Sequence, residues 1–419
     1  MRTRGNIWGN LDWITVFLYL ALVLYGWLSI YSASVDDTSK SIFDFSTRYG
    51  KQLVWIGLAL FLALSILIID AKFFSTFAYL FYFLMLVILM GVLLFGKTVA
   101  GSKSWFQIGS FAIQPAEFAK FATALALAKY LSTLNVNMRQ LKTKIVAITI
   151  LAVPAVLILL QNDTGSALVY FSFVLVLYRE GFSGIIIVLG VIMTALFIVT
   201  LWFGNTYVAG TLVSLAIIYL VFVKKRKKRY KMVIAILALS LAYVFSVNYA
   251  FEKVLEPHQK TRIQVLLGMK KDIHGAGYNV NQAKIAIGSG GLKGKGYMNG
   301  MLTHNRFVPE QSTDFIFCTI GEERGFLGSA LLIFLFAGLM VRLIYLSERQ
   351  RSMFSRIYGY GVVSVLFFHF TVNIGMTIGL APVVGIPLPF FSYGGSSLWA
   401  FTILLFIFLK QDANRLNVL

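Results

Sequence analysis

Long apolar stretches, separated by short polar segments, recur along almost the whole chain. Many approach the roughly 20 residues that an α-helix needs to cross a hydrocarbon core of about 30 Å. We therefore predict an all-α fold, a polytopic transmembrane helical bundle of 10–12 spans that makes residues 1–419 a single membrane domain. The predicted spans are residues 12–32, 52–70, 74–95, 115–132, 144–160, 165–179, 184–203, 207–223, 231–250, 326–346, 357–379 and 395–409.

Composition agrees with this pattern. The chain is 58% hydrophobic and 13% charged, whereas soluble domains carry about 25% charged residues. Its single cysteine, Cys318, excludes an intrachain disulfide and a cysteine metal cluster. Arg2 and Arg4 precede the first apolar run, but no small-residue cleavage site follows it. We expect that run to remain as a spanning helix.

Membrane orientation is the first explanation to test for the net charge of +20. If the N-terminus is cytoplasmic, the basic run Lys224–Arg229 and the Arg349–Arg356 cluster both fall inside, as the positive-inside rule requires. An even number of spans also places the C-terminus inside. We therefore expect contacts with membrane lipids and none with nucleic acid. The Lys224–Arg229 run has a second interpretation, as a site for anionic lipids.

One extracytoplasmic loop, at about residues 251–325, is basic although it lies outside on this map. Its residues 251–311 hold nine Lys and Arg against four Asp and Glu. Lys293 and Lys295 stand among glycines, so ammonium charges and exposed backbone N–H groups lie together, which suits phosphate oxygens. The alternative interpretation is a flexible, solvated hairpin.

An acidic residue follows this loop at the predicted membrane edge. Ser312 or Thr313 can cap a helix that begins here, which places Asp314 in its first turn. Asp314 precedes Phe-Ile-Phe, and a partly desolvated acid at a membrane edge is a functional candidate. The alternative is a capping role only. For Glu322 and Glu323 we favour structural pairing with Arg324 or nearby lysines.

Three further polar segments fall on the same outer side. Glu117 and Lys120 share one helix face behind Pro115, either lining a polar cavity or forming a structural ion pair. Asp163 lies in a turn between two spans and can cap the second of them. Residues 385–397 are too irregular for lipid, so we expect them to be buried in protein or to line a cavity. The shared side predicts one outward-facing site.

These segments, in this order, resemble the SEDS family (shape, elongation, division and sporulation proteins). The resemblance rests on Gln114–Glu117, Gln282–Gly296, Pro309–Phe317 and Ser392–Ser397, and residues 385–390 look like the elongation members. The chain departs from the family pattern in three places. Gln161–Ser166 keeps only part of a usual motif, Ser104 replaces a frequent Arg, and surplus spans fall within about 184–250.

The resemblance implies a peptidoglycan glycosyltransferase of the bacterial cytoplasmic membrane. It would polymerise lipid II, a disaccharide-pentapeptide on a polyprenyl pyrophosphate, into glycan strands during cell elongation by inverting transfer. Asp314 would be the general base, a divalent cation (Mg or Mn) is possible, and a class B penicillin-binding protein would be the partner. Alternatives are a lipid II flippase and a non-catalytic scaffold. Candidate substrate-binding residues are Trp105, Glu117, Lys120, Asp163, Arg262, Gln282, Lys293, Lys295, Glu310 and Ser396.

Overall fold

The computed structural model describes residues 7–35, 41–99, 101–109, 111–134, 136–222, 227–255, 257–270 and 275–416. The chain forms two compact units. Unit 1 consists of Met1–Phe182 and Asn279–Leu419, and unit 2 consists of Ser183–Tyr278. All but one of the predicted site residues belong to unit 1, and the exception is Arg262.

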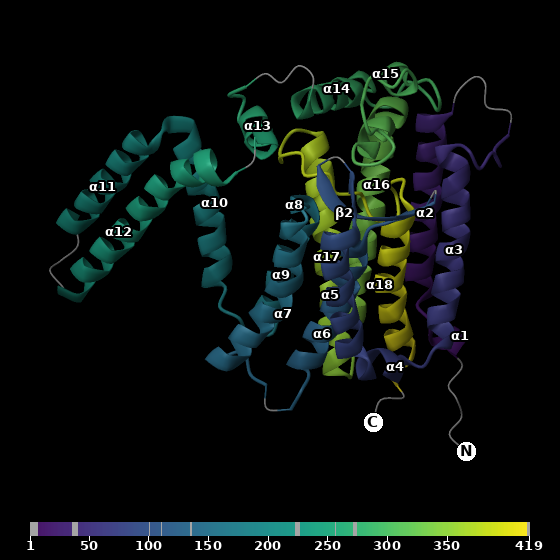
Figure 1. The fold of residues 1–419 in the computed structure, drawn as a ribbon, viewed down its shortest axis with the longest axis horizontal. Coiled ribbons are helices and arrows are strands. Elements are labelled where there is room, and N and C mark those ends of the chain that lie inside the picture. The colour runs from purple at the N-terminus through teal and green to yellow at the C-terminus, as the bar shows by residue number, and fades with distance from the viewer. Residues whose placement is uncertain are drawn as a thin grey trace. The chain divides into compact units, whose positions relative to one another are not determined.

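Unit 1 is a helical bundle (Figure 1). Its first half contains α1 (Ile7–Asn10), α2 (Trp13–Ser34), α3 (Arg48–Ile68), α4 (Ala71–Thr76), α5 (Ala78–Phe95), α6 (Pro115–Leu131), α7 (Leu141–Leu160), α8 (Thr164–Leu168), the 3₁₀ helix η1 (Val169–Ser172) and α9 (Phe173–Arg179). Its second half contains α14 (Ala276–Ser289, in this unit from Asn279), α15 (Met301–His304), α16 (Ile316–Glu348), α17 (Met353–Thr377) and α18 (Gly395–Ala413).

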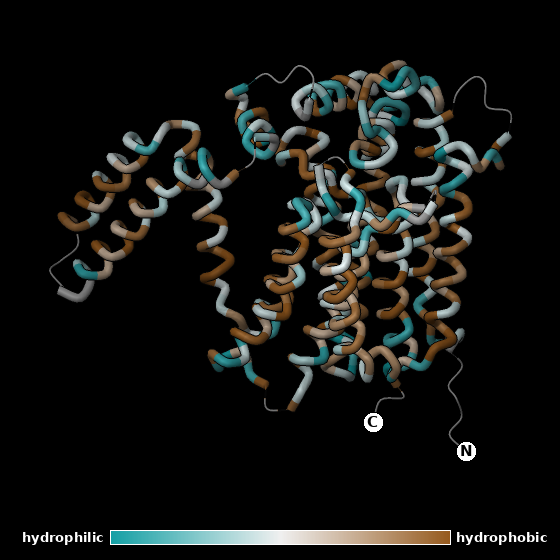
Figure 2. Tube along the Cα trace, viewed as in Figure 1, coloured by the Kyte–Doolittle hydropathy of each residue, from teal (hydrophilic) through white to brown (hydrophobic). Residues whose placement is uncertain are grey.

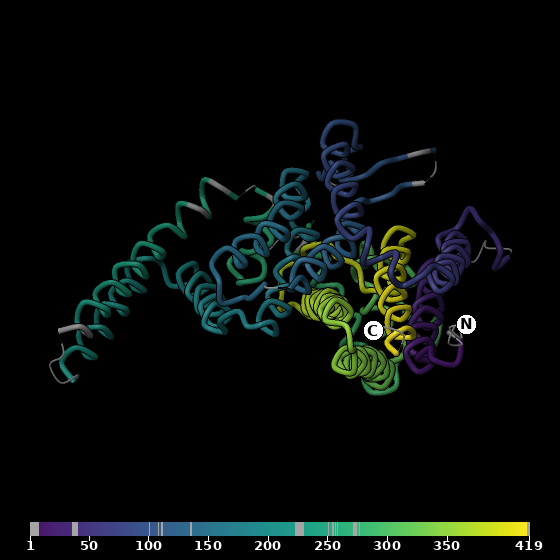
Figure 3. Tube along the Cα trace, turned by 90° about the horizontal axis from the view of Figure 1, so that it is seen from below, coloured from purple at the N-terminus to yellow at the C-terminus, as the bar shows by residue number. Residues whose placement is uncertain are grey.

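The last helix is the centre of this bundle. Helix α18 packs against α3, α6 and α17, while α16 packs against α17 and α2. In α18, 83% of the apolar stretch is buried, against 28% in α3. Figure 3 looks along the helices and shows yellow α18 between the purple N-terminal helices and yellow-green α17. Helices from both halves of unit 1 therefore pack around α18.

The two ends of unit 1 differ in what they carry. Apolar residues follow the lengths of the helices, and polar residues gather at their ends (Figure 2). Helix α1 and the C-terminal end of α18 lie at one end, with α14 and α15 at the other (Figure 1). At the terminal end, Arg342 binds Asp12 and Arg349 binds Asp412, each with an N–O distance of 2.5 Å. The start of the first described helix and the end of the last one thus share one side, as an even number of spans requires.

The all-α, polytopic prediction is confirmed. Ten helices of the described residues are long and apolar enough to cross a membrane. Two other predicted spans coincide with shorter helices. Helix α6 has 17 residues, and the segment Thr164–Arg179 is interrupted by the 3₁₀ turn η1.

A small antiparallel sheet, which we did not predict, joins α5 to α6. Strand β2 (Ser102–Ile108) pairs with β1 (Lys97–Val99) on one side and β3 (Phe111–Ile113) on the other. The flanking strands have only three residues each. Such strands are too short to give a period-two signal in the sequence.

Unit 2 holds the three apolar helices expected between about 184 and 250. They are α10 (Ile185–Phe203), α11 (Asn205–Phe222) and α12 (Lys227–Tyr249), followed by the π-helical turn η2 (Ala250–Val254) and α13 (Pro257–Leu266). Helices α11 and α12 pack against each other and both contact α10. The basic residues Lys224, Lys225 and Arg226 lie outside the described residues.

The predicted helix start at Ser312 or Thr313 is wrong. Helix α16 begins at Ile316, and Asp314 lies in the preceding turns. The Ser312 hydroxyl instead accepts a hydrogen bond from Arg48, and the Thr313 hydroxyl donates to Glu310. The region 251–325 is also more helical than a loop, since it contains α13, α14, α15 and the start of α16.

Candidate functional site

Asp314 is held in position by its backbone. Its carbonyl oxygen accepts a hydrogen bond from Asn373 Nδ2 at 2.9 Å. Its half-buried carboxylate faces Gly385, where an added Cβ would lie 3.3 Å from Oδ2. Gly385 has φ 70°, a conformation that glycine adopts without strain. The carboxylate therefore lies against a close-approaching backbone and not at the cap of α16.

Residues 312–314, the Asp314 turn, are hydrogen-bonded to the irregular segment 385–394. The sequence analysis predicted that these two segments belong to one site. Ser392 Oγ donates to the Thr313 carbonyl at 2.6 Å, and Tyr393 N donates to the Ser312 carbonyl at 2.9 Å. Ser392 Oγ also accepts from Leu388 N at 2.9 Å. These bonds satisfy the irregular backbone inside the protein, where unpaired polar groups are costly.

Helix α17 carries two buried polar residues that our sequence analysis missed. His369 and Asn373 are four residues apart and so share a face. Asn373 Nδ2 donates to the Ile386 carbonyl at 2.8 Å as well as to Asp314. His369 Nδ1 lies 3.0 Å from the Pro387 carbonyl. The signal was available, because two amide- or imidazole-bearing residues one turn apart are unusual in an apolar span.

His369 also connects this segment to the predicted Glu117–Lys120 pair. Because a carbonyl only accepts, His369 Nδ1 carries the proton, and Nε2 accepts from Lys120 Nζ at 2.9 Å. Lys120 Nζ lies 2.7 Å from Glu117 Oε1, and both side chains are buried. The ammonium also lies 5.1 Å from the Phe401 ring centroid. The predicted shared face is confirmed. Both hydrogen bonds that Lys120 Nζ donates are to buried side chains of the protein.

Asp163 and Ser396 both contact Gln114, the residue before α6. Asp163 Oδ1 accepts from Ser166 N at 3.0 Å, so the predicted capping role is confirmed. Its other oxygen accepts from Gln114 Nε2 at 2.6 Å. Ser396 Oγ donates to the Ala112 carbonyl at 3.1 Å and lies 3.3 Å from Gln114 N. The two residues fasten β3, α6, α8 and α18 together.

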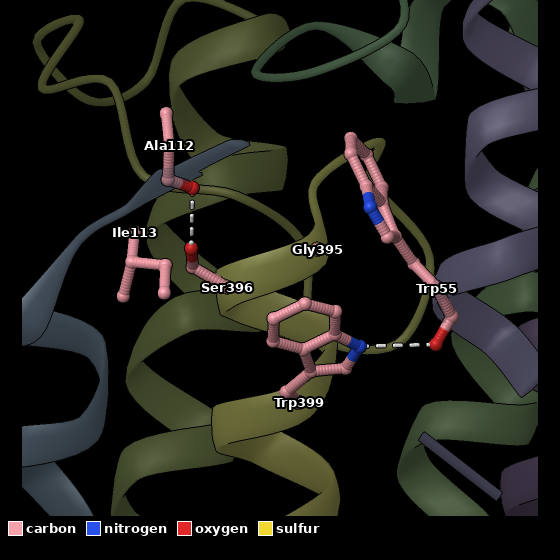
Figure 4. A pocket seen from close by; sticks show the side chains of 6 residues that line it. All are labelled: Trp55, Ala112, Ile113, Gly395, Ser396 and Trp399. Carbon is pink, nitrogen blue, oxygen red and sulfur yellow. Dashed lines mark hydrogen bonds between the residues drawn. The ribbon is translucent and has the colours of Figure 1, made fainter. Parts of the chain in front are cut away.

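A mainly apolar cavity of about 190 Å³ opens beside Ser396. Figure 4 shows the rings of Trp55 and Trp399 on one side and Ala112 with Ile113 on the other. Trp399 Nε1 donates to the Trp55 carbonyl at 3.0 Å, which fixes the Trp399 ring. Trp105 is half-buried on β2, opposite Lys97, and does not line this cavity.

Comparison with known proteins identifies the family. The model of the cell cycle protein family that comprises FtsW, RodA and SpoVE matches residues 12–209 and 207–416. The chain belongs to this SEDS family.

Individual SEDS relatives match over at least nine tenths of their length. The peptidoglycan glycosyltransferase RodA of Treponema pallidum is 34% identical, covering 99% of this chain and 100% of the relative. Escherichia coli MrdB, also named a peptidoglycan glycosyltransferase, is 31% identical over 93% and 90% of the two chains. The resemblance to elongation members in residues 385–390 agrees with these relatives.

Solved structures give the same fold. A chain from a peptidoglycan synthase complex that coordinates polymerisation and crosslinking superposes with a TM-score of 0.70 at 26% identity. It covers 97% of this chain and 98% of that one. RodA from Thermus thermophilus superposes with a TM-score of 0.62 at 25% identity, covering 97% of each chain.

The remaining substrate-binding candidates of this SEDS chain are dispersed. Lys295 Nζ is 2.7 Å from Glu322 Oε1, and Glu322 also accepts from Leu302 N and Thr303 N. The structural role predicted for Glu322 is therefore confirmed, and Lys295 is engaged in it. Of the others, Lys293 is exposed, Gln282 is half-buried on α14, exposed Glu310 accepts from Thr313, and Arg262 lies on α13 in unit 2.

A third residue that the sequence analysis missed is Arg48, at the start of α3. Its Nη1 donates to Ser312 Oγ at 2.6 Å, two residues before Asp314. Its guanidinium lies 5.8 Å from the ring centroid of Tyr393. Burial raises the pKa of Tyr393, and the Arg48 charge opposes that rise. Arg48 thus places a positive charge directly against the Asp314 turn.

The residues do not by themselves assemble a metal centre. Within the described part of the chain, no three His, Cys, Asp or Glu side chains lie so that they could hold an ion. Mg²⁺ is commonly held by one or two carboxylates together with substrate phosphates. Asp314 is the carboxylate that could serve in this way, and the divalent cation stays a prediction.

Proposed function

We infer that this chain is a peptidoglycan glycosyltransferase that polymerises lipid II into glycan strands during cell elongation. The single observation that supports it best is the buried framework around Asp314. Asn373 and Ser392 fix the backbone of the turn, while the carboxylate faces Gly385. A half-buried carboxylate on a turn held by several hydrogen bonds is suited to proton transfer, because its position is fixed before the substrate binds.

The inferred reaction is an inverting substitution. Asp314 accepts the proton of one sugar's 4-hydroxyl while that oxygen bonds to the anomeric carbon of a second sugar. The bond from the anomeric carbon to the pyrophosphate breaks, and the pyrophosphate leaves with both electrons. Positioned proton transfer of this kind contributes about 10²–10⁴-fold in rate. Positive charge beside the leaving group stabilises the charge that develops there.

We also infer the setting of the reaction. Ten apolar helices among the described residues make the chain a multi-pass membrane protein. We place it in the bacterial cytoplasmic membrane with both termini inside. The charge pattern supports this orientation. The synthase complex among the relatives supports a class B penicillin-binding protein as partner. That partner would crosslink the strands, and it should co-purify in mild detergent when co-expressed.

The deciding experiment gives purified protein to labelled lipid II, with and without Mg²⁺ or Mn²⁺. Glycan strands resolved by gel support the glycosyltransferase. Movement of lipid II across vesicles without polymer would instead support a flippase. Neither product, together with stimulation of a partner synthase, would support a scaffold. This one assay tests both whether lipid II is the substrate and whether polymerisation depends on a divalent cation.

A further inference from the structure

Arg48 is a cation at the Asp314 turn whose hydrogen-bonding capacity is mostly unused. A guanidinium has five N–H donors in a fixed fork. Within the described residues, Arg48 makes one side-chain hydrogen bond, to Ser312 Oγ, and forms no ion pair. The residue is exposed. Most of its donors are thus available to an anion.

The surrounding contacts hold this guanidinium near Asp314. Consecutive Cα atoms are 3.8 Å apart, so Ser312 and Asp314 have Cα atoms within about 7.6 Å of each other. Tyr393 supports Arg48 through its ring and binds the Ser312 carbonyl through its backbone N–H. Arg48 is therefore fixed by the same segment that fixes the Asp314 turn.

Two other cations proposed for a phosphate group already have protein partners. Lys120 is buried and bound to Glu117 and His369. Lys295 is paired with Glu322. Arg guanidinium groups also match phosphate oxygens in a bidentate manner that lysine cannot reproduce. Arg48, by contrast, contacts the Asp314 turn through Ser312.

We propose that Arg48 binds the pyrophosphate of the polyprenyl-linked substrate beside Asp314. This inference rests on the glycosyltransferase function inferred above and adds the residue that recognises the leaving group. Arg48 thereby places the anomeric carbon within reach of Asp314 and stabilises the departing charge. Ser312 and Tyr393 orient the guanidinium and do not themselves contact the phosphates.

Equilibrium binding of a polyprenyl pyrophosphate to the purified full chain tests this directly. Hydrogen bonds to charged groups are worth about 1.5–3 kcal/mol, or roughly 10- to 100-fold in affinity. We expect Arg48→Gln to weaken binding by about that factor, and Arg48→Lys to lie between it and the wild type. The matched control is Lys51→Gln, which removes an exposed charge one turn along α3. It should bind like the wild type.

Two further arms separate ligand binding from a structural role. Ser312→Ala removes the anchor of Arg48 but keeps the cation, so its affinity should fall much less than that of Arg48→Gln. The corresponding polyprenyl alcohol should bind all variants alike, because it has no phosphate. Equal pyrophosphate affinity of Arg48→Gln and Lys51→Gln would overturn the proposal. So would a Ser312→Ala defect as large as that of Arg48→Gln.

Failure of the Arg48 proposal can be distinguished from failure of the glycosyltransferase function. If wild-type protein makes no glycan strands but its pyrophosphate binding still depends on Arg48, the glycosyltransferase is rejected and the binding site stands. If polymerisation proceeds and Arg48→Gln alters neither affinity nor KM for lipid II, the binding site is rejected alone.

Discussion

Replacing Lys120 by methionine tests what the buried Glu117–Lys120 pair does. The two charged groups lie 2.7 Å apart with side-chain exposures of 1% and 2%. Removing one partner leaves the other charge buried without compensation, which costs about 3–5 kcal/mol of folding stability. Glu117 is especially vulnerable, because its Oε2 has no hydrogen-bond partner among the described residues.

The double variant Lys120→Met/Glu117→Gln removes both charges. Its stability should return close to that of the wild type, because replacing both members of a buried pair is often near neutral. The single and double variants form a cycle whose coupling term isolates the pair. Thermal unfolding in detergent measures stability, and lipid II polymerisation measures function. Lys129→Met, a half-buried lysine in the last turn of α6, is the matched control.

The activity of the double variant then distinguishes two roles. If the pair serves only structure, the double variant regains both stability and turnover. We expect it to regain stability but to polymerise more slowly, since Lys120 also orients His369. A Lys120→Met single variant as stable as the double variant would refute the reasoning, because no uncompensated charge would then be present.

Two further predictions concern α17 and the topology. His369→Phe removes the bonds to Pro387 and Lys120 and should lower kcat about tenfold, and His369→Asn, which can still donate to the Pro387 carbonyl, should recover part of it. Unchanged kcat in the Phe variant would exclude a positioning role. In a Cys318→Ser background, a cysteine at exposed position 293 should react with an impermeant reagent outside cells, and one at exposed position 351 should not. The opposite labelling would invert the membrane map.

The local parts of the site could be predicted from the sequence. Glu117 and Lys120 are three residues apart on a helix that Pro115 starts, so their pairing follows from helix geometry. Asp163 precedes a helix and caps it, as its residue type favours. Long apolar runs fixed the spans because the bilayer sets their length.

The remaining parts depend on contacts between distant segments. Arg48 and Ser312 are 264 residues apart in the chain, and no local pattern joins them. The hydroxyls of Ser312 and Thr313 have good capping chemistry, but tertiary partners bind them instead. The sequence marks His369 only as a polar residue in an apolar span, and its role comes from the distant Pro387 carbonyl and Lys120. Nonlocal hydrogen bonds therefore decided the details of the site.

The most direct test of the account compares Asp314→Asn with the wild type in lipid II polymerisation. Asparagine keeps the shape of the side chain and removes its basicity, while the Asn373 bond to the backbone carbonyl is unaffected. Both proteins should be monodisperse and matched in amount. We predict a loss of polymerisation of about 10²–10⁴-fold, with folding and partner binding intact. Long glycan strands made by the Asn variant at near wild-type rate would contradict the assignment of Asp314 as the general base.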